Sequence, residues 1–185
     1  MEPPDAPSPS EVRPNRRPVW IAAAVVAVLV VVLLAYALTS NPTLPPQQGQ
    51  AVPPFELTTL DGKPADLESL AGQVVVLNFF SSWCAPCRQE APDLQQAWQR
   101  YQDRDVQFLG VAFKDASSKA QAFLDEFDAT YPAAMDAGSR TARAYGVTGV
   151  PETFVIDRQG RLVRHFVGPV TADELSQEIE ALLGP

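Results

Sequence analysis

The sequence has few of the residues that build metal sites and disulfide frameworks. It contains two cysteines, two methionines and one histidine among 185 residues. Small disulfide-stabilised scaffolds need more cysteines, and a zinc site needs about four ligands, so we predict no metal site. Both cysteines lie in the stretch SSWCAPCRQEAP, as Cys84 and Cys87. The pair must be explained by chemistry that two nearby thiols perform alone.

A basic surface is missing as well. The chain has 22 acidic residues against 14 Lys and Arg, and its net charge is −8 at pH 7. Nucleic-acid binding depends on basic side chains that neutralise phosphates, and the sequence shows no stripe of them. We therefore exclude nucleic acid as a partner.

Charged side chains are absent from residues 19–39, VWIAAAVVAVLVVVLLAYALT. A helix of this length, at about 1.5 Å per residue, crosses a hydrocarbon core of ~30 Å. We predict one transmembrane helix here. A buried core helix would show a polar face. A signal peptide cleaved after Ala37 is also open, although the apolar run is long for one.

The flanking segments set the orientation. Residues 1–18 are rich in proline and poor in apolar side chains, which predicts a disordered tail. Arg13, Arg16 and Arg17 precede the apolar run, and basic residues stay on the cytoplasmic side. We expect a cytoplasmic N-terminus and a domain outside the bacterial cell membrane. Residues 40–54, rich in Pro and Gln, are predicted to form an extended linker.

Residues 55–185 alternate between strand and helix patterns. Residues 73–80 and 106–113 are nearly continuous apolar runs, typical of strands covered on both faces. A turn at residues 61–62 predicts an N-terminal hairpin, and a second hairpin is predicted over residues 153–167. This order predicts an α/β domain whose sheet has parallel pairs and antiparallel edges.

Helices are predicted between and after these strands. One follows the cysteines, another covers residues 117–127 with Ser117 or Ser118 as its N-cap, and a short one covers residues 139–145. The last helix begins after Thr171, which forms a capping box with Glu174.

The position of Cys84, between a buried strand and a helix, favours a reactive thiolate. A helix N-terminus stabilises negative charge and lowers the pKa of a cysteine there. Cys87 lies one turn later and can displace a mixed disulfide. A structural disulfide across so short a loop would contribute little, and Arg88 breaks the C-x-x-C-H pattern of haem attachment. We therefore predict thiol–disulfide exchange, without a cofactor because the dithiol itself carries two electrons.

Three stretches carry a resemblance to a known family: NFFSSWCAPCRQEAP, GVTGVPETFVID and HFVGPVT. They resemble the thioredoxin fold and, more narrowly, the membrane-tethered TlpA/ResA/DsbE group. The resemblance implies a central mixed sheet flanked by helices, with the N-terminal hairpin as an extension. It also implies an enzyme that reduces disulfides outside the cytoplasmic membrane, often in cytochrome c maturation.

The resemblance also assigns roles to single residues. Cys84 matches the exposed nucleophile and Cys87 the buried resolving thiol. Pro151 matches the family's cis-proline, and Val150 before it would offer backbone groups to an extended substrate. Trp83 and Pro86, which flank Cys84, are candidate substrate contacts; we expect Trp83 to shield the sulfur on one side.

Acidic residues are the remaining candidates. Ordinary thioredoxins have a buried aspartate where this chain has Asn78, whereas the group resembled has a glutamate three residues after the second cysteine, as Glu90 here. We predict that Glu90 is partly buried, has a raised pKa and exchanges a proton with Cys87; a solvated glutamate is the alternative. Glu152 is a second candidate for tuning the thiols or contacting substrate, against a plain surface residue. His165 is interpreted as structural.

The resemblance implies partners as well. The expected clients are exported proteins with disulfides, such as apocytochrome c, and the expected electron donor is a membrane protein of the DsbD or CcdA type. Two other functions remain open: an oxidase or isomerase that makes disulfides, and a copper-delivery protein that uses the cysteine pair as ligands.

Overall fold

The computed structural model describes residues 25–34 and 45–184, in two units that are considered separately. Residues 25–34 form a helix with exposed apolar side chains. Among the described residues, no helix combines the length and the apolar character needed to cross a membrane. The other residues of the predicted 19–39 helix lie outside the described part, as do the predicted tail 1–18 and Ala37.

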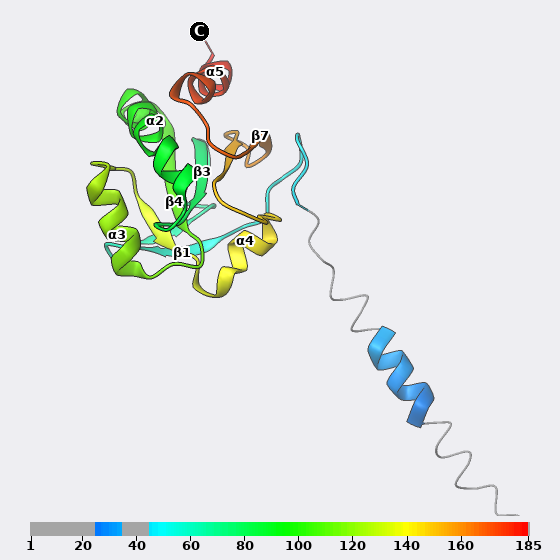
Figure 1. Cartoon of the computed structure of the whole chain (residues 1–185). Coiled ribbons are helices and arrows are strands. Elements are labelled where there is room, and N and C mark those ends of the chain that lie inside the picture. The colour runs from blue at the N-terminus through cyan, green and yellow to red at the C-terminus, as the bar shows by residue number, and fades with distance from the viewer. Residues whose placement is uncertain (1–24, 35–44, 185) are drawn as a thin grey trace, which may run out of the picture. The chain divides into compact units, whose positions relative to one another are not determined.

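The domain is built on one seven-stranded mixed sheet with the order β2-β1-β5-β4-β3-β6-β7 (Figure 1). The central pair, β3 and β4, is parallel, and β6 and β7 add an antiparallel edge. All seven residues of β3 are buried, as the nearly continuous apolar run predicted. The strands are β1 Glu56–Thr59, β2 Pro64–Asp66, β3 Val74–Phe80, β4 Val106–Ala112, β5 Ala133–Met135, β6 Glu152–Ile156 and β7 Leu162–Val167.

Helices cover both faces of the sheet. Helices α2 (Ala85–Tyr101), α3 (Ser117–Glu126) and α5 (Ala172–Leu183) bury apolar side chains against one face, with Val74, Val76 and Phe80 of β3. The short helix α4 (Arg140–Ala144) packs on the other face, with Val75, Leu77 and Phe79. The alternation of β3 side chains between the two cores confirms the predicted layered α/β fold of thioredoxin type.

The predicted caps have different outcomes. Thr171 caps α5 and forms the predicted capping box with Glu174. The predicted cap of α3 is wrong, because the N-cap is Ala116, without a side-chain hydrogen bond. Ser117 is the first residue of the helix rather than its cap. The Asp115 carboxylate accepts the Ala116 N–H just before it.

Strand β5 was not predicted, although it joins the N-terminal hairpin to the sheet. It pairs in parallel with β4 and antiparallel with β1. The predicted hairpin itself is confirmed as β1 and β2.

The end of the predicted linker belongs to the domain. Gly49 N–H and Val52 N–H donate to Leu162 O and Gly160 O, and Leu162 N–H donates to Gln50 O. Val52 is buried, with 6% of its surface exposed. The predicted linker over residues 40–54 therefore ends earlier than expected, because the backbone of residues 49–52 pairs with the β6–β7 hairpin. Packing begins before the predicted boundary at Phe55.

Candidate active site

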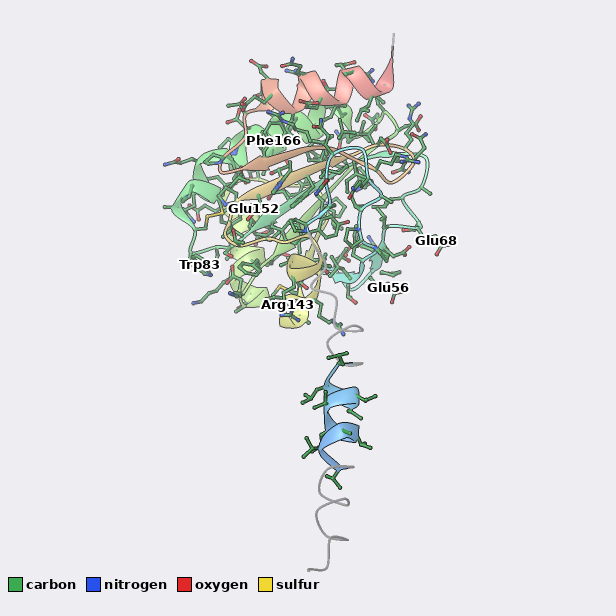
Figure 2. All side chains as sticks on the ribbon, turned by 90° about the vertical axis from the view of Figure 1, so that its right-hand side faces the viewer. Glu56, Glu68, Trp83, Arg143, Glu152 and Phe166 are labelled. Carbon is green, nitrogen blue, oxygen red and sulfur yellow. A yellow bond between two sulfur atoms is a disulfide. The ribbon has the colours of Figure 1, made fainter. Side chains whose placement is uncertain are left out.

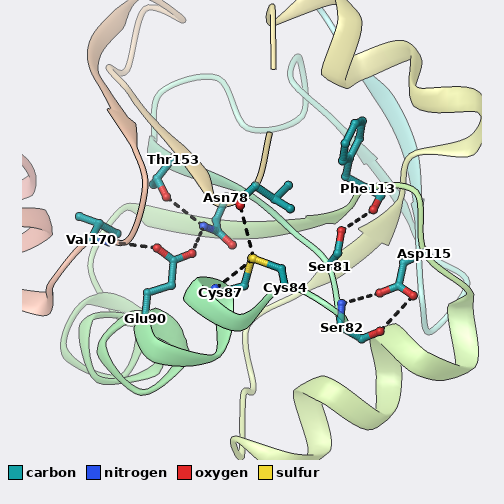
Figure 3. The surroundings of a disulfide bond; sticks show 11 residues. Asn78, Ser81, Ser82, Cys84, Cys87, Glu90, Phe113, Asp115, Thr153 and Val170 are labelled. Carbon is teal, nitrogen blue, oxygen red and sulfur yellow. Dashed lines mark hydrogen bonds between the residues drawn. A yellow bond between two sulfur atoms is a disulfide. The ribbon is translucent and has the colours of Figure 1, made fainter. Parts of the chain in front are cut away.

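The two cysteines form a disulfide at the start of α2 (Figure 3). Cys84 is the N-cap residue, and its sulfur accepts the Cys87 N–H at 3.1 Å. Pro86 fits the first turn, where its missing N–H costs no helical hydrogen bond. A thiolate at Cys84 would meet the same N–H and the positive end of the helix dipole. The geometry suits the predicted nucleophile and resolving pair.

Cys84 is less exposed than the resemblance implied. Only 3% of its surface reaches solvent, and 1% of that of Cys87. The reason is the loop before β6, since the Cys84 sulfur lies 3.4 Å from the Val150 carbonyl oxygen. The peptide bond between Val150 and Pro151 is cis, as predicted. A backbone hydrogen bond also holds the cis-proline loop in place, since Gly168 N–H donates to Pro151 O at 3.0 Å.

A buried polar cluster lies beside the disulfide. Glu90, with 1% of its surface exposed, accepts hydrogen bonds from Asn78 Nδ2 at 2.8 Å and from Val170 N–H at 3.0 Å. Burial raises the pKa of Glu90 to about 7, although the two hydrogen bonds partly oppose this shift. The burial of Glu90 excludes the solvated alternative, and the raised pKa agrees with the prediction. A carboxyl group with this pKa can take or give a proton at neutral pH.

Comparison with known proteins identifies the family. Residues 48–165 match the AhpC/TSA family. The chain is 36% identical over 138 residues to the thiol:disulfide interchange protein HelX of Rhodobacter capsulatus, covering 73% of this chain and 76% of that protein. It is 31% identical over 129 residues to the thiol-disulfide oxidoreductase ResA of Bacillus anthracis, covering 70% and 75%. A secreted Mycobacterium tuberculosis disulfide oxidoreductase, homologous to Escherichia coli DsbE, superposes with a TM-score of 0.63 at 30% identity, covering 69% of this chain and 96% of that one.

The chain belongs to the AhpC/TSA family. Within it, the chain is a thiol-disulfide oxidoreductase of the ResA and DsbE type. This membership agrees with the disulfide at a helix N-terminus and the cis-proline loop against it.

Glu152, the second acidic candidate, follows the cis-proline. It is buried, with 3% of its surface exposed, so it is not a plain surface residue. One carboxylate oxygen accepts the N–H groups of Thr148 and Gly149, and the other lies 2.8 Å from His165 Nε2. His165 also stacks on the Phe154 ring, at 4.1 Å between centroids. In this oxidoreductase Glu152 therefore fastens the loop that carries the cis-proline, and His165 has the structural position predicted for it.

Trp83 is the large exposed side chain next to the disulfide. It leaves 63% of its surface exposed, and its Nε1 donates to Lys114 O at 3.3 Å (Figure 2). Pro86 and Val150 are half-buried. Their position near Cys84 agrees with substrate contact, which remains a prediction.

Two supporting interactions were missed by the sequence analysis. Asp115 accepts hydrogen bonds from Ser82 N–H at 2.6 Å and Ser82 Oγ at 3.1 Å. It thereby ties the loop before Cys84 to the loop before α3. Asn78 also joins Glu90 to Thr153 Oγ1, at 2.9 Å. The sequence placed Asn78 where ordinary thioredoxins have an aspartate, but did not predict its hydrogen bonds to Glu90 and Thr153.

Proposed function

We propose that this enzyme works outside the cytoplasmic membrane and reduces disulfides in exported proteins, with apocytochrome c as its favoured client. The observation that carries the proposal is the disulfide at the N-terminus of α2, flanked by the cis-proline loop and by a buried Glu90 that titrates near neutral pH. The secreted relative and the uncharged run at residues 19–39 support a membrane-anchored domain facing outward.

The reduction proceeds in two exchanges. The Cys84 thiolate attacks a client disulfide, one client thiolate leaves, and a mixed disulfide forms. Cys87 then loses its proton to the Glu90 carboxylate and attacks the Cys84 sulfur. The bond between Cys84 and the client breaks, and the second client thiolate leaves. The client gains two electrons, the cysteine pair becomes the disulfide, and a membrane donor of the DsbD or CcdA type returns two electrons. The dithiol is the only redox group that this cycle needs.

The substrate would lie along the cis-proline loop. The backbone of Val150, before the cis-proline, offers an extended client segment a partner beside the disulfide, and the exposed Trp83 ring offers apolar contact. This arrangement suits the short C-x-x-C-H segment of an apocytochrome c, whose two cysteines must be reduced before haem attaches.

The direction is tested by the reduction potential of the full chain in detergent, equilibrated with defined thiol buffers. A value near or below thioredoxin's roughly −270 mV supports a reductant that needs an electron supply. A value near the ~−120 mV of a strong oxidant would overturn the direction and indicate an oxidase or isomerase.

The client is tested with trapping variants. Cys87→Ser should accumulate a mixed disulfide with an oxidised C-x-x-C-H peptide, because Cys84 attacks and nothing resolves the product. Cys84→Ser is the matched control and should trap none. Equal trapping of an unrelated disulfide peptide would contradict the preference for apocytochrome c while leaving the chemistry intact.

A further inference from the structure

Asn78 has a buried side-chain oxygen without a hydrogen-bond partner among the described residues. It lies in the middle of β3 with 2% of its surface exposed. Its Nδ2 donates to Glu90 Oε1 and to Thr153 Oγ1, at 2.8 and 2.9 Å. Its Oδ1 has no hydrogen-bond partner among the described residues. Leaving a buried acceptor unpaired costs about 1–3 kcal/mol, so a donor is expected in another state of the protein.

The donor can come from the reduction of the disulfide. In Figure 3 the Asn78 side chain lies between the Glu90 carboxylate and the cysteine pair, with its nitrogen turned to Glu90 and its oxygen turned to the cysteines. Reduction converts the Cys87 sulfur into a thiol, which can donate. Cys87 is 1% exposed, so water cannot serve as its acceptor at the surface. A buried donor and a buried acceptor thus become available together.

We propose that Asn78 is a positioning residue that couples the Cys87 thiol to the Glu90 carboxyl in the reduced enzyme. Asn78 Oδ1 accepts the Cys87 S–H while Nδ2 holds Glu90 Oε1, and Thr153 Oγ1 fixes the amide plane. Hydrogen bonds in such a chain polarise one another. An ionised Glu90 makes Oδ1 a better acceptor for the Cys87 S–H. Once Glu90 has taken the thiol proton, its neutral carboxyl no longer opposes the negative charge of the Cys87 thiolate. The inference rests on the proposed role of Glu90 as proton acceptor for Cys87.

Other ionisable groups near Glu90 do not provide this link. Asp93, three residues further along α2, acts on Glu90 through its charge and accepts the Ala172 N–H. Tyr131 is buried, and burial raises the pKa of its phenol well above the usual range, so it stays neutral. Asn78 is the side chain with a direct hydrogen bond to Glu90 and an acceptor turned toward the cysteines.

The test is a double-mutant cycle on the reduced full chain, with the titration of Cys87 followed by NMR of labelled cysteine. Glu90→Gln should lower the pKa of the Cys87 thiol by about one unit, which is a tenfold rise in its acid dissociation constant. In the Asn78→Leu background the same change should have less than about a third of this effect. Asn78→Leu should also raise the pKa of Glu90 above about 7, since it removes a hydrogen bond that lowers it.

The outcomes separate the inference from the proposed function. An equal effect of Glu90→Gln in both backgrounds would overturn the role of Asn78 and leave that of Glu90 intact. No effect of Glu90→Gln in the wild-type background would overturn the role of Glu90 itself. Gln95→Leu is the matched control. It removes a buried amide in α2 that is hydrogen-bonded to Thr130, and it should leave the coupling between Glu90 and Cys87 unchanged.

A measurement on the wild-type protein keeps the inference testable if Asn78→Leu does not fold. The Asn78 side-chain amide resonance should titrate with a midpoint near 7 in the oxidised protein, where it reports Glu90. Reduction should shift its carbonyl carbon as the Cys87 S–H hydrogen bond forms. A carbonyl shift unchanged by reduction would overturn the proposal.

Discussion

Two acidic residues of the domain, Glu90 and Glu152, are buried, yet the protein holds their carboxylates in different ways. Glu152 accepts two backbone N–H groups with one oxygen and contacts His165 with the other. Glu90 accepts one backbone N–H and one neutral amide, and its burial raises its pKa to about 7. Glu152 therefore serves to hold a loop, whereas Glu90 is left able to exchange a proton.

The largest expected effect concerns Glu90 and the pH dependence of stability. The folded-state pKa of Glu90 is raised above 4.5 to about 7, so its protonated form stabilises the fold. This stability is complete below pH 4.5 and is lost as pH rises through about 7. In the oxidised protein the loss should reach about 3 kcal/mol. Urea unfolding over this pH range should show that the free energy of unfolding falls with rising pH in the wild type but not in Glu90→Gln. The same pH dependence in both proteins would contradict the comparison.

The next effect concerns the loop held by Glu152. Glu152→Ala leaves the N–H groups of Thr148 and Gly149 without their acceptor and should lower the free energy of unfolding by about 2 kcal/mol. It should also lower client reduction, since the cis-proline loop loses its support. Glu152→Gln, which keeps an acceptor oxygen, is the control and should retain most of both. If Gln proves as damaging as Ala, charge rather than loop support is the role of Glu152.

A smaller effect is expected at His165. His165→Phe keeps the stacking on Phe154 and removes only the contact with Glu152. The unfolding free energy should fall by about 1 kcal/mol, and the titration of the cysteines should stay unchanged. A changed thiol titration would show that the Glu152 side of the site also controls proton exchange.

The smallest effect on stability is expected at Trp83, whose ring is mostly exposed. Trp83→Ala should change the unfolding free energy by less than about 0.5 kcal/mol. The KM for a C-x-x-C-H peptide should rise several-fold with kcat little changed, because apolar contact with the client is lost. An unchanged KM would remove Trp83 from the substrate surface.

The sequence predicted those features that depend on local pattern. The apolar run of β3, the capping box of α5 and the cysteines at a helix N-terminus all carry their signal within a few residues. Strand β5 carries no such local signal, because three residues are too few to show the alternation of a strand. Only its pairing with β4 and β1 defines it.

The site divides in the same way. The raised pKa of Glu90 followed from the resemblance and its place on α2. The role of Glu152 could not be predicted, because it depends on the backbone of residues 148–149 and on an imidazole from another strand. The pairing of residues 49–52 with the β6–β7 hairpin was missed for the same reason, since the two segments are far apart in the chain.

The most direct test of the central claim is the titration of the glutamate carboxyl carbons in the oxidised protein, followed by NMR with labelled glutamate. The account predicts one resonance with a midpoint near 7, absent from Glu90→Gln. A Glu90 resonance with its midpoint near the ordinary 4.5 would contradict the account, because Glu90 could then not receive the Cys87 proton at neutral pH.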